Sequence, residues 1–128
     1  MSYSTRRRLT ESLIEAGERL DHLGLVPARD GNLSARLAKD RVLVTATGVR
    51  KRGLKPDDLV EVNLTGTVYG RGRASTELGM HLAVYRARPD IMAIFHTHSP
   101  WASGVIWLIA ICIDSAGSTM PFCRCNSR

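Results

Sequence analysis

The chain has 128 residues, of which 44% are hydrophobic and 23% are charged, so it is long enough for one globular domain and too short for two. Its formal net charge is +6, but the basic residues are scattered and lack the interleaved aromatics or zinc-finger spacing of a nucleic-acid interface. Aromatic residues make up only 5% of the chain, which argues against stacking on single strands. We therefore expect no nucleic-acid partner.

The first half of the chain reads as one helix followed by short strands. Apolar residues at helical spacing predict an amphipathic helix over residues 4–23, with Gly24 as its end. A polar stretch over residues 27–34 contains the turn signal Asp30-Gly31-Asn32. Two strands are then predicted at residues 41–46 and 59–64. A hairpin turn at residues 65–66 leads into a short return strand at residues 67–69, and residues 70–73 are predicted to be a loop.

The second half predicts a helix, a buried strand and a further helix start. A helix over residues 76–88, capped by Ser75 or Thr76, ends before a Pro-Asp pair. A buried strand over residues 91–98 runs into His96-Thr97-His98. Ser99-Pro100 then has the form of another helix start. The order of elements indicates a mixed α/β domain.

The C-terminal residues do not indicate a membrane protein or a secreted one. The apolar run 105–113 is well short of the roughly 20 residues that span a bilayer. The three cysteines, Cys112, Cys123 and Cys125, are an odd number, and none occurs earlier, unlike a secreted disulfide framework. No signal peptide opens the sequence. We expect a cytoplasmic protein with no membrane partner.

The pair His96-x-His98 is the sharpest chemical feature of the sequence. Residues two apart in a strand point to the same face, so two imidazoles at a strand end can chelate one metal ion, and zinc suits imidazole nitrogen. A His-x-His pair taken alone can also be a surface or hydrogen-bonded pair. The apolar run before it and Ser99-Pro100 after it favour the mouth of a core strand.

Glu77 is the second candidate, at the start of the predicted helix. The helix dipole favours a carboxylate there, which suits a metal ligand, a general base or an ordinary helix cap. Its neighbour one helical turn later, His81, shares that face, and we expect packing or a hydrogen bond for it. His22 is expected on the surface.

Small polar clusters form the third group of candidates. Glycine turns and helix starts present backbone N–H groups, and with nearby hydroxyls they can cradle a phosphate. Each cluster taken singly can also be an ordinary turn or cap. The clusters are Gly31-Asn32-Leu33-Ser34, Thr45-Ala46-Thr47-Gly48 and Ser75-Thr76.

In this order and spacing, the motifs resemble the class II aldolase/adducin family, of the fuculose-phosphate aldolase and ribulose-phosphate 4-epimerase type. The resemblance covers roughly residues 9–106. The motifs that carry it are Asp30-Gly31-Asn32-Leu33-Ser34, Thr45-Ala46-Thr47-Gly48, Ser75-Thr76-Glu77, the run over residues 81–90 and His96-Thr97-His98-Ser99.

The resemblance implies a fold, a cofactor and a role for each motif. It implies a three-layer α/β domain around a central, mostly antiparallel sheet, and a homo-oligomer if the C-terminal part is supplied. His96, His98 and Glu77 would hold zinc or another divalent metal, and Glu77 would also act as the catalytic acid/base. The phosphate of a phosphorylated sugar would bind at Asn32, Thr47, Gly48, Ser75 and Thr76.

Two departures from the family pattern qualify the expectation. Arg29 stands where a small or hydroxyl residue is common, so it could either add a cation to the phosphate site or obstruct it. The family supplies a third zinc histidine downstream, whereas this sequence has no histidine after His98. No cysteine spacing supports a replacement. We therefore divide the chain into a partial domain over residues 1–106 and a divergent, truncated or frame-shifted tail over residues 107–128.

The sequence thus predicts a zinc-dependent carbon–carbon lyase, an aldolase that acts on a phosphorylated sugar through a metal-stabilised enediolate. The scaffold is also similar to epimerases, decarboxylases and dehydratases of sugar phosphates. The alternative from another functional class is a non-catalytic, truncated aldolase/adducin-like module without a complete metal site.

Overall fold

The computed structural model describes residues 3–99 and 110–114. Within these ranges the chain forms two α-helices, one 3-10 helix and six strands. In chain order they are α1 (Tyr3–His22), β1 (Asn32–Ala38), β2 (Arg41–Thr45), η1 (Pro56–Asp58), β3 (Leu59–Asn63), β4 (Val68–Tyr69), α2 (Leu78–Ala87), β5 (Ile91–His96) and β6 (Ala110–Asp114).

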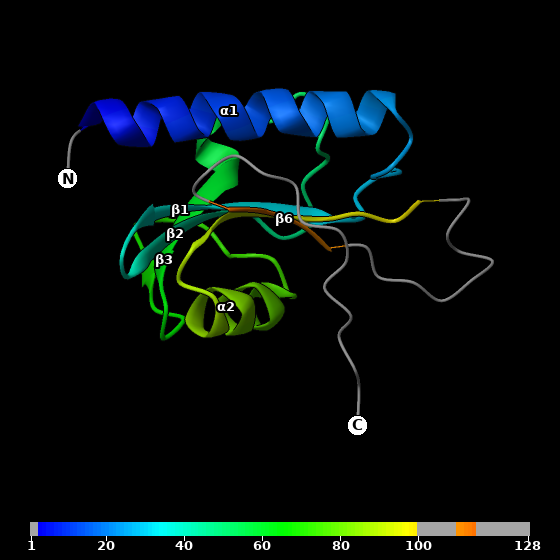
Figure 1. The fold of residues 1–128 in the computed structure, drawn as a ribbon. Coiled ribbons are helices and arrows are strands. Elements are labelled where there is room, and N and C mark those ends of the chain that lie inside the picture. The colour runs from blue at the N-terminus through cyan, green and yellow to red at the C-terminus, as the bar shows by residue number, and fades with distance from the viewer. Residues whose placement is uncertain (1–2, 100–109, 115–128) are drawn as a thin grey trace.

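The strands make one sheet in the order β4-β3-β2-β1-β5-β6, and all five neighbouring pairs are antiparallel. Helix α1 lies along one face of the sheet and α2 along the other, as Figure 1 shows. The result is a helix–sheet–helix arrangement of three layers. The predicted three-layer α/β fold with an antiparallel sheet is therefore confirmed.

Each face of the sheet has its own apolar core, because side chains along a strand alternate between faces. Leu43 of β2 packs with Leu13 and Leu20 of α1. Its neighbours in β2, Val42 and Val44, pack on the opposite face with residues of α2. This two-sided burial fixes the register of the central strands, and with it the places of the side chains at the strand ends.

Strand β1 was not predicted, although it lies at the centre of the sheet between β2 and β5. The residues of β1 that face α1 are apolar, including Leu33. The alternate residues Asn32, Ser34 and Arg36 are polar and buried. Residues 32–37 thus alternate between polar and apolar, which is the pattern of a strand, but the prediction had assigned residues 27–34 to a polar turn. The turn signal in this region ends at Gly31, which has a φ of 71°.

Two element boundaries differ from the prediction at the residues of chemical interest. Helix α2 begins at Leu78, and its N-cap is Glu77, not Ser75 or Thr76; Ser75 instead accepts the Glu77 backbone N–H at 3.3 Å. Strand β5 ends at His96, so His98 lies beyond the strand. The prediction that the two histidines share a strand face is therefore wrong.

The C-terminal segment contributes one described strand. Residues 110–114 form β6, which pairs with β5 in a register that sets His96 opposite Ala110. This strand lies inside the segment 107–128 that was expected to be divergent. From Pro100 on, the helix predicted to begin at Ser99-Pro100 lies outside the described residues, and so do Cys123 and Cys125. No helix in the described ranges has both the length and the apolar character needed to cross a membrane.

Candidate metal centre

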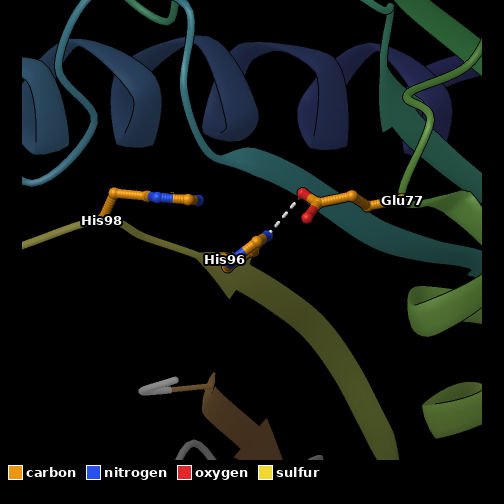
Figure 2. Close-up of side chains that lie close together, drawn as sticks. All are labelled: Glu77, His96 and His98. Carbon is orange, nitrogen blue, oxygen red and sulfur yellow. Dashed lines mark hydrogen bonds and ion pairs between the residues drawn. The ribbon is translucent and has the colours of Figure 1, made fainter. Parts of the chain in front are cut away.

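Glu77, His96 and His98 each direct one potential ligand atom toward a common point, and these three atoms lie within 4.8 Å of one another. Figure 2 shows the carboxylate approaching the two imidazoles from the opposite side. The Oε2 atom of Glu77 lies 2.7 Å from Nδ1 of His96. The structure therefore brings a carboxylate from a helix start next to two imidazoles near a strand end, and their role as metal ligands stays a prediction.

The sheet and one loop contact hold the two histidines in place. His96 is buried and stands opposite Asn32 in the β1–β5 ladder. Beyond the strand, the backbone N–H of His98 donates to the carbonyl of Leu25 at 2.7 Å. This bond ties the segment after β5 to the loop after α1, and the two imidazole centroids come within 4.7 Å.

Glu77 is the N-cap of α2, but its side chain does not cap the helix. Its carboxylate instead accepts a hydrogen bond from the Asn32 amide and contacts Nδ1 of His96. Burial alone would raise the pKa of Glu77, but the Asn32 hydrogen bond and the two imidazoles outweigh it and hold that pKa below its usual value. The carboxylate is therefore kept ionised, as a ligand or a proton acceptor requires.

The donor set fits a divalent transition metal. Two imidazoles and one carboxylate are a ligand combination of catalytic zinc sites, which leave a further position open for substrate or water. Glu77 and His98 are exposed, so a ligand from solvent can reach the centre.

An open pocket of about 220 Å³ adjoins two of the three side chains. Glu77 and His98 line it, and so do all five residues expected to bind phosphate. Those five are Asn32, Thr47, Gly48, Ser75 and Thr76. The structure thus gathers them in one place, and their binding role stays a prediction.

Backbone hydrogen bonds hold the two loops of this pocket together. The Thr47 N–H donates to Arg73 O at 2.9 Å, and the Ser75 N–H donates to Thr45 O at 3.1 Å. Gly48 has a φ of 70°, a conformation that glycine adopts without strain. The loop after β2 therefore lies directly against the loop that leads into α2.

Lys51 is a pocket residue that the sequence did not reveal. Its side chain is buried although its neighbours Arg50 and Arg52 are exposed, and a run of three basic residues gives no sign of which one turns inward. Its ammonium donates to the carbonyls of Arg29 at 3.0 Å and Val49 at 2.8 Å. Arg29 itself is exposed at the rim of the pocket.

The other two histidines behave as expected. His22 is exposed at the end of α1. His81 is fully buried and hydrogen-bonds Ser34 at 2.6 Å and Asn32. Burial is the main reason that the pKa of His81 falls to about 4, so the ring is neutral at pH 7.

The sequence model described as the Class II Aldolase and Adducin N-terminal domain matches residues 11–122. The chain belongs to the class II aldolase and adducin family. The match includes β6 and so extends beyond residue 106, where the motif-based resemblance stopped. The class II aldolase fold is shown as well by the solved structure described next.

Relatives in this family include lyases of sugar phosphates. The chain is 41% identical over 88 residues to methylthioribulose-1-phosphate dehydratase of Methylococcus capsulatus, covering 69% of this chain and 43% of that protein. It is 37% identical over 97 residues to 5-deoxy-D-ribulose 1-phosphate aldolase of Bacillus thuringiensis serovar kurstaki, covering 74% and 46%. A crystal structure of L-fuculose-1-phosphate aldolase from Thermus thermophilus matches with a TM-score of 0.63 and 41% identity, covering 73% and 47%. The chain thus spans less than half the length of these relatives.

Proposed function

We propose that this chain carries the metal centre and phosphate pocket of a divalent-metal lyase that acts on a phosphorylated ketose. The observation that supports the proposal is the convergence of Glu77, His96 and His98 within 4.8 Å, beside a polar pocket. Neither feature alone would suffice, because exposed acidic groups and histidine pairs occur without metals. The proposal depends on their adjacency.

His96, His98 and the Glu77 carboxylate would hold the ion, and zinc is the metal proposed. A bound divalent cation supplies a Lewis acid that polarises oxygens of a carbonyl substrate and stabilises the negative charge that develops there. The protein's part is to keep three donors, from the start of α2, the end of β5 and the segment just after β5, at a fixed separation. Glu77 and His96 both contact Asn32 of β1, and His98 is tied to Leu25 through its backbone.

The proposed substrate carries its phosphate in the adjoining pocket. The hydroxyls of Thr47, Ser75 and Thr76 can each donate to a phosphate oxygen. The Lys51 ammonium lies at the same pocket and uses two of its three hydrogens on backbone carbonyls, which leaves one for an anion. The exposed Arg29 adds positive charge at the rim and favours entry of a dianion.

Glu77 is the proposed proton acceptor. A carboxylate kept ionised and exposed beside the donor set can take a proton from a substrate hydroxyl or from a carbon next to a carbonyl. The first step leads to carbon–carbon cleavage and the second to loss of water. Aldolase chemistry is the leading proposal from the motifs, and dehydration is the second candidate, since a relative with 41% identity is named a dehydratase.

Metal content distinguishes the proposed lyase from the alternative, a non-catalytic module. We expect the purified chain to bind about one zinc per chain, with the metal lost in His96→Ala and His98→Ala and retained in His22→Ala. The exposed His22 controls for general histidine binding. A chain that is folded yet free of zinc at micromolar supply would support the module.

The reaction is then tested on the metal-loaded chain with ketose 1-phosphates. Release of dihydroxyacetone phosphate, measured with a coupled dehydrogenase, supports the aldolase. A product of unchanged carbon number that has lost one water, measured by mass spectrometry, supports the dehydratase. The cytoplasmic location and the homo-oligomer remain predictions, tested by fractionation and by light scattering.

A further inference from the structure

A line of hydrogen-bonded side chains runs through the protein interior and ends at the candidate metal centre. The Tyr85 hydroxyl lies 2.9 Å from Ser34 Oγ, and Ser34 Oγ lies 2.6 Å from Nδ1 of His81. The other ring nitrogen, Nε2 of His81, contacts the Asn32 side-chain oxygen. The Asn32 amide nitrogen in turn donates to Glu77. The line joins α2, β1 and the ligand set.

The Glu77 carboxylate, at the end of this line, fixes which group donates and which accepts in each of its hydrogen bonds. An ionised carboxylate only accepts, so the Asn32 amide must present its NH₂ to Glu77 and its oxygen to His81. An amide oxygen also only accepts, and His81 Nε2 must therefore carry hydrogen. A neutral imidazole then leaves Nδ1 as an acceptor for the Ser34 hydroxyl, and Ser34 accepts from Tyr85.

The interior favours this arrangement over the other protonation states. His81 and Ser34 have no solvent exposure and Tyr85 has 1%, so a charged imidazole at this place would be costly. The lowered pKa of His81, about 4, agrees with a neutral ring. The tautomer with hydrogen on Nδ1 would set a bare Nε2 against the Asn32 oxygen, two acceptors in contact.

We propose that His81 is a positioning residue: it locks the Asn32 amide through its Nε2 hydrogen, and the locked amide holds the Glu77 carboxylate at the metal ligands. The proposal rests on the proposed function only in taking Glu77, His96 and His98 as metal ligands. Without His81, the Asn32 amide is free to turn over and would present its oxygen to the carboxylate. Two like partial charges would then push Glu77 away from His96.

A merely structural role for this line would predict something different. If the buried polar groups only satisfy one another, then removing His81 should lower stability and leave metal affinity unchanged in the folded protein. The decisive quantity is therefore the zinc affinity of the folded molecules, compared between the His81 variants and the unsubstituted chain. Orienting partners of metal ligands are typically worth about 10–100-fold in affinity.

The experiment measures zinc affinity of the full chain by competition with a chromophoric chelator, with urea unfolding measured alongside. His81→Leu removes the donor, while His81→Gln keeps an N–H donor near the Nε2 position. We expect about 10–100-fold weaker zinc binding in His81→Leu, substantial recovery in His81→Gln, and no change in the exposed control His22→Gln. Equal zinc affinity of folded His81→Leu and the unsubstituted chain would overturn the proposal, and so would equal losses in both His81 variants.

Two further measurements keep the test decisive if His81→Leu does not fold or if the chain binds no zinc. Ser34→Ala is a small change that removes the donor to Nδ1 of His81, and nitrogen NMR of the metal-free chain reads the tautomer directly. We expect hydrogen on Nε2 in the unsubstituted protein and a mixture of tautomers in Ser34→Ala. Hydrogen on Nδ1 in the unsubstituted protein would overturn the proposal. A chain that binds no zinc but shows the Nε2–H tautomer refutes the proposed function and not the positioning role of His81. That role is then tested by crystal structures of metal-free His81→Gln and Ser34→Ala. We expect Glu77 to stay at His96 in His81→Gln and to move away in Ser34→Ala.

Discussion

Glu77 Oε2 and His96 Nδ1 lie 2.7 Å apart although 19 residues separate them in the sequence. One side chain comes from the N-cap of α2 and the other from the last residue of β5. Both elements contact β1 through Asn32, which pairs with His96 in the ladder and hydrogen-bonds Glu77. Strand β1 is thus the common support of the candidate metal centre.

The charge of Glu77 should matter more to metal binding than its shape. Glu77→Gln keeps the side-chain volume but offers a neutral amide, which is a poor ligand for a divalent ion. We expect zinc binding to weaken by more than about 100-fold, since even an outer partner of a ligand is worth about 10–100-fold. Chelator competition measures the effect, and Glu15→Gln on the exposed face of α1 is the matched control. Equal affinities in the two variants would remove Glu77 from the ligand set.

Gly31 should be intolerant of any side chain, for a reason that a second glycine can isolate. Gly24 and Gly31 have nearly the same φ, 70° and 71°, so an alanine at either one pays about 1 kcal/mol of backbone strain. A Cβ at Gly31 would also lie 2.5 Å from the His96 carbonyl oxygen, whereas a Cβ at Gly24 meets nothing within 4 Å.

We expect Gly24→Ala to lower the free energy of unfolding by about 1 kcal/mol and Gly31→Ala by more than about 3 kcal/mol. Urea unfolding measures both. The difference between the variants reports the close approach of the loop to β5, since the backbone strain cancels. Similar losses in the two variants would show that the loop before β1 does not pack against His96.

The sequence predicted most elements of the fold, with strand β1 as the main exception. The helix α1 and the strands β2 and β3 follow simple apolar periods, and these elements were predicted within a few residues. Strand β1 was missed although residues 32–37 alternate between polar and apolar, because the turn signal at Asp30-Gly31-Asn32 led residues 27–34 to be assigned to a polar turn. The alternation does not reveal that the polar face is buried, since the hydrogen-bond partners of Ser34 and Arg36 lie far away in the sequence.

The candidate site was found from its motifs, but not its supporting contacts. His96, His98 and Glu77 were selected as a group, although His98 lies past the strand end and reaches the group through its backbone bond to Leu25. Lys51 was hidden in a run of basic residues. Its burial depends on the carbonyls of two loops, a feature with no local sequence signal.

Lys51 should contribute both to the pocket loops and to anion binding. Lys51→Met keeps the buried stem but leaves the carbonyls of Arg29 and Val49 without their ammonium donor. We expect a loss of about 2 kcal/mol in the free energy of unfolding and weaker binding of inorganic phosphate, measured by calorimetry. The control is Arg52→Met, an exposed residue. Unchanged phosphate affinity in folded Lys51→Met would exclude the ammonium from the phosphate site.

Arg36 should be the costliest arginine to replace. Its buried guanidinium donates to the carbonyls of Ile91, Lys39 and Tyr85 at 3.0, 3.1 and 2.8 Å and lies 4.7 Å from the Tyr85 ring centroid. Arg36→Met removes these hydrogen bonds from the interior beneath α2, so we expect a loss of about 3 kcal/mol. Arg86→Met, at an exposed residue with one bond to Leu64 O, should cost less than about 1 kcal/mol. Thermal and urea unfolding compare the two variants.

Stability should fall in mildly acidic solution because of His81. The pKa of His81 is about 4 in the folded protein, chiefly through burial, against an ordinary 6.5, so the unfolded chain binds the extra proton first as the pH falls. The stability that the neutral His81 ring contributes is fully present above its ordinary pKa of 6.5. It is lost as the pH falls from there toward about 4, the pKa of His81 in the folded protein. Between pH 7 and pH 4.5 the loss amounts to about 2 kcal/mol.

The lowered pKa of Glu77 acts in a separate range, because its stabilisation is lost only as the pH falls below the ordinary carboxyl value of 4.5 and through its folded pKa. Unfolding between pH 7 and 4.5 therefore separates the contribution of His81 from that of Glu77. We expect His81→Gln to flatten the decline in this range and the exposed control His22→Gln to retain it. A decline of the same steepness in His81→Gln would mean that the ring is charged in the folded protein, or that other groups set the acid limit of this fold.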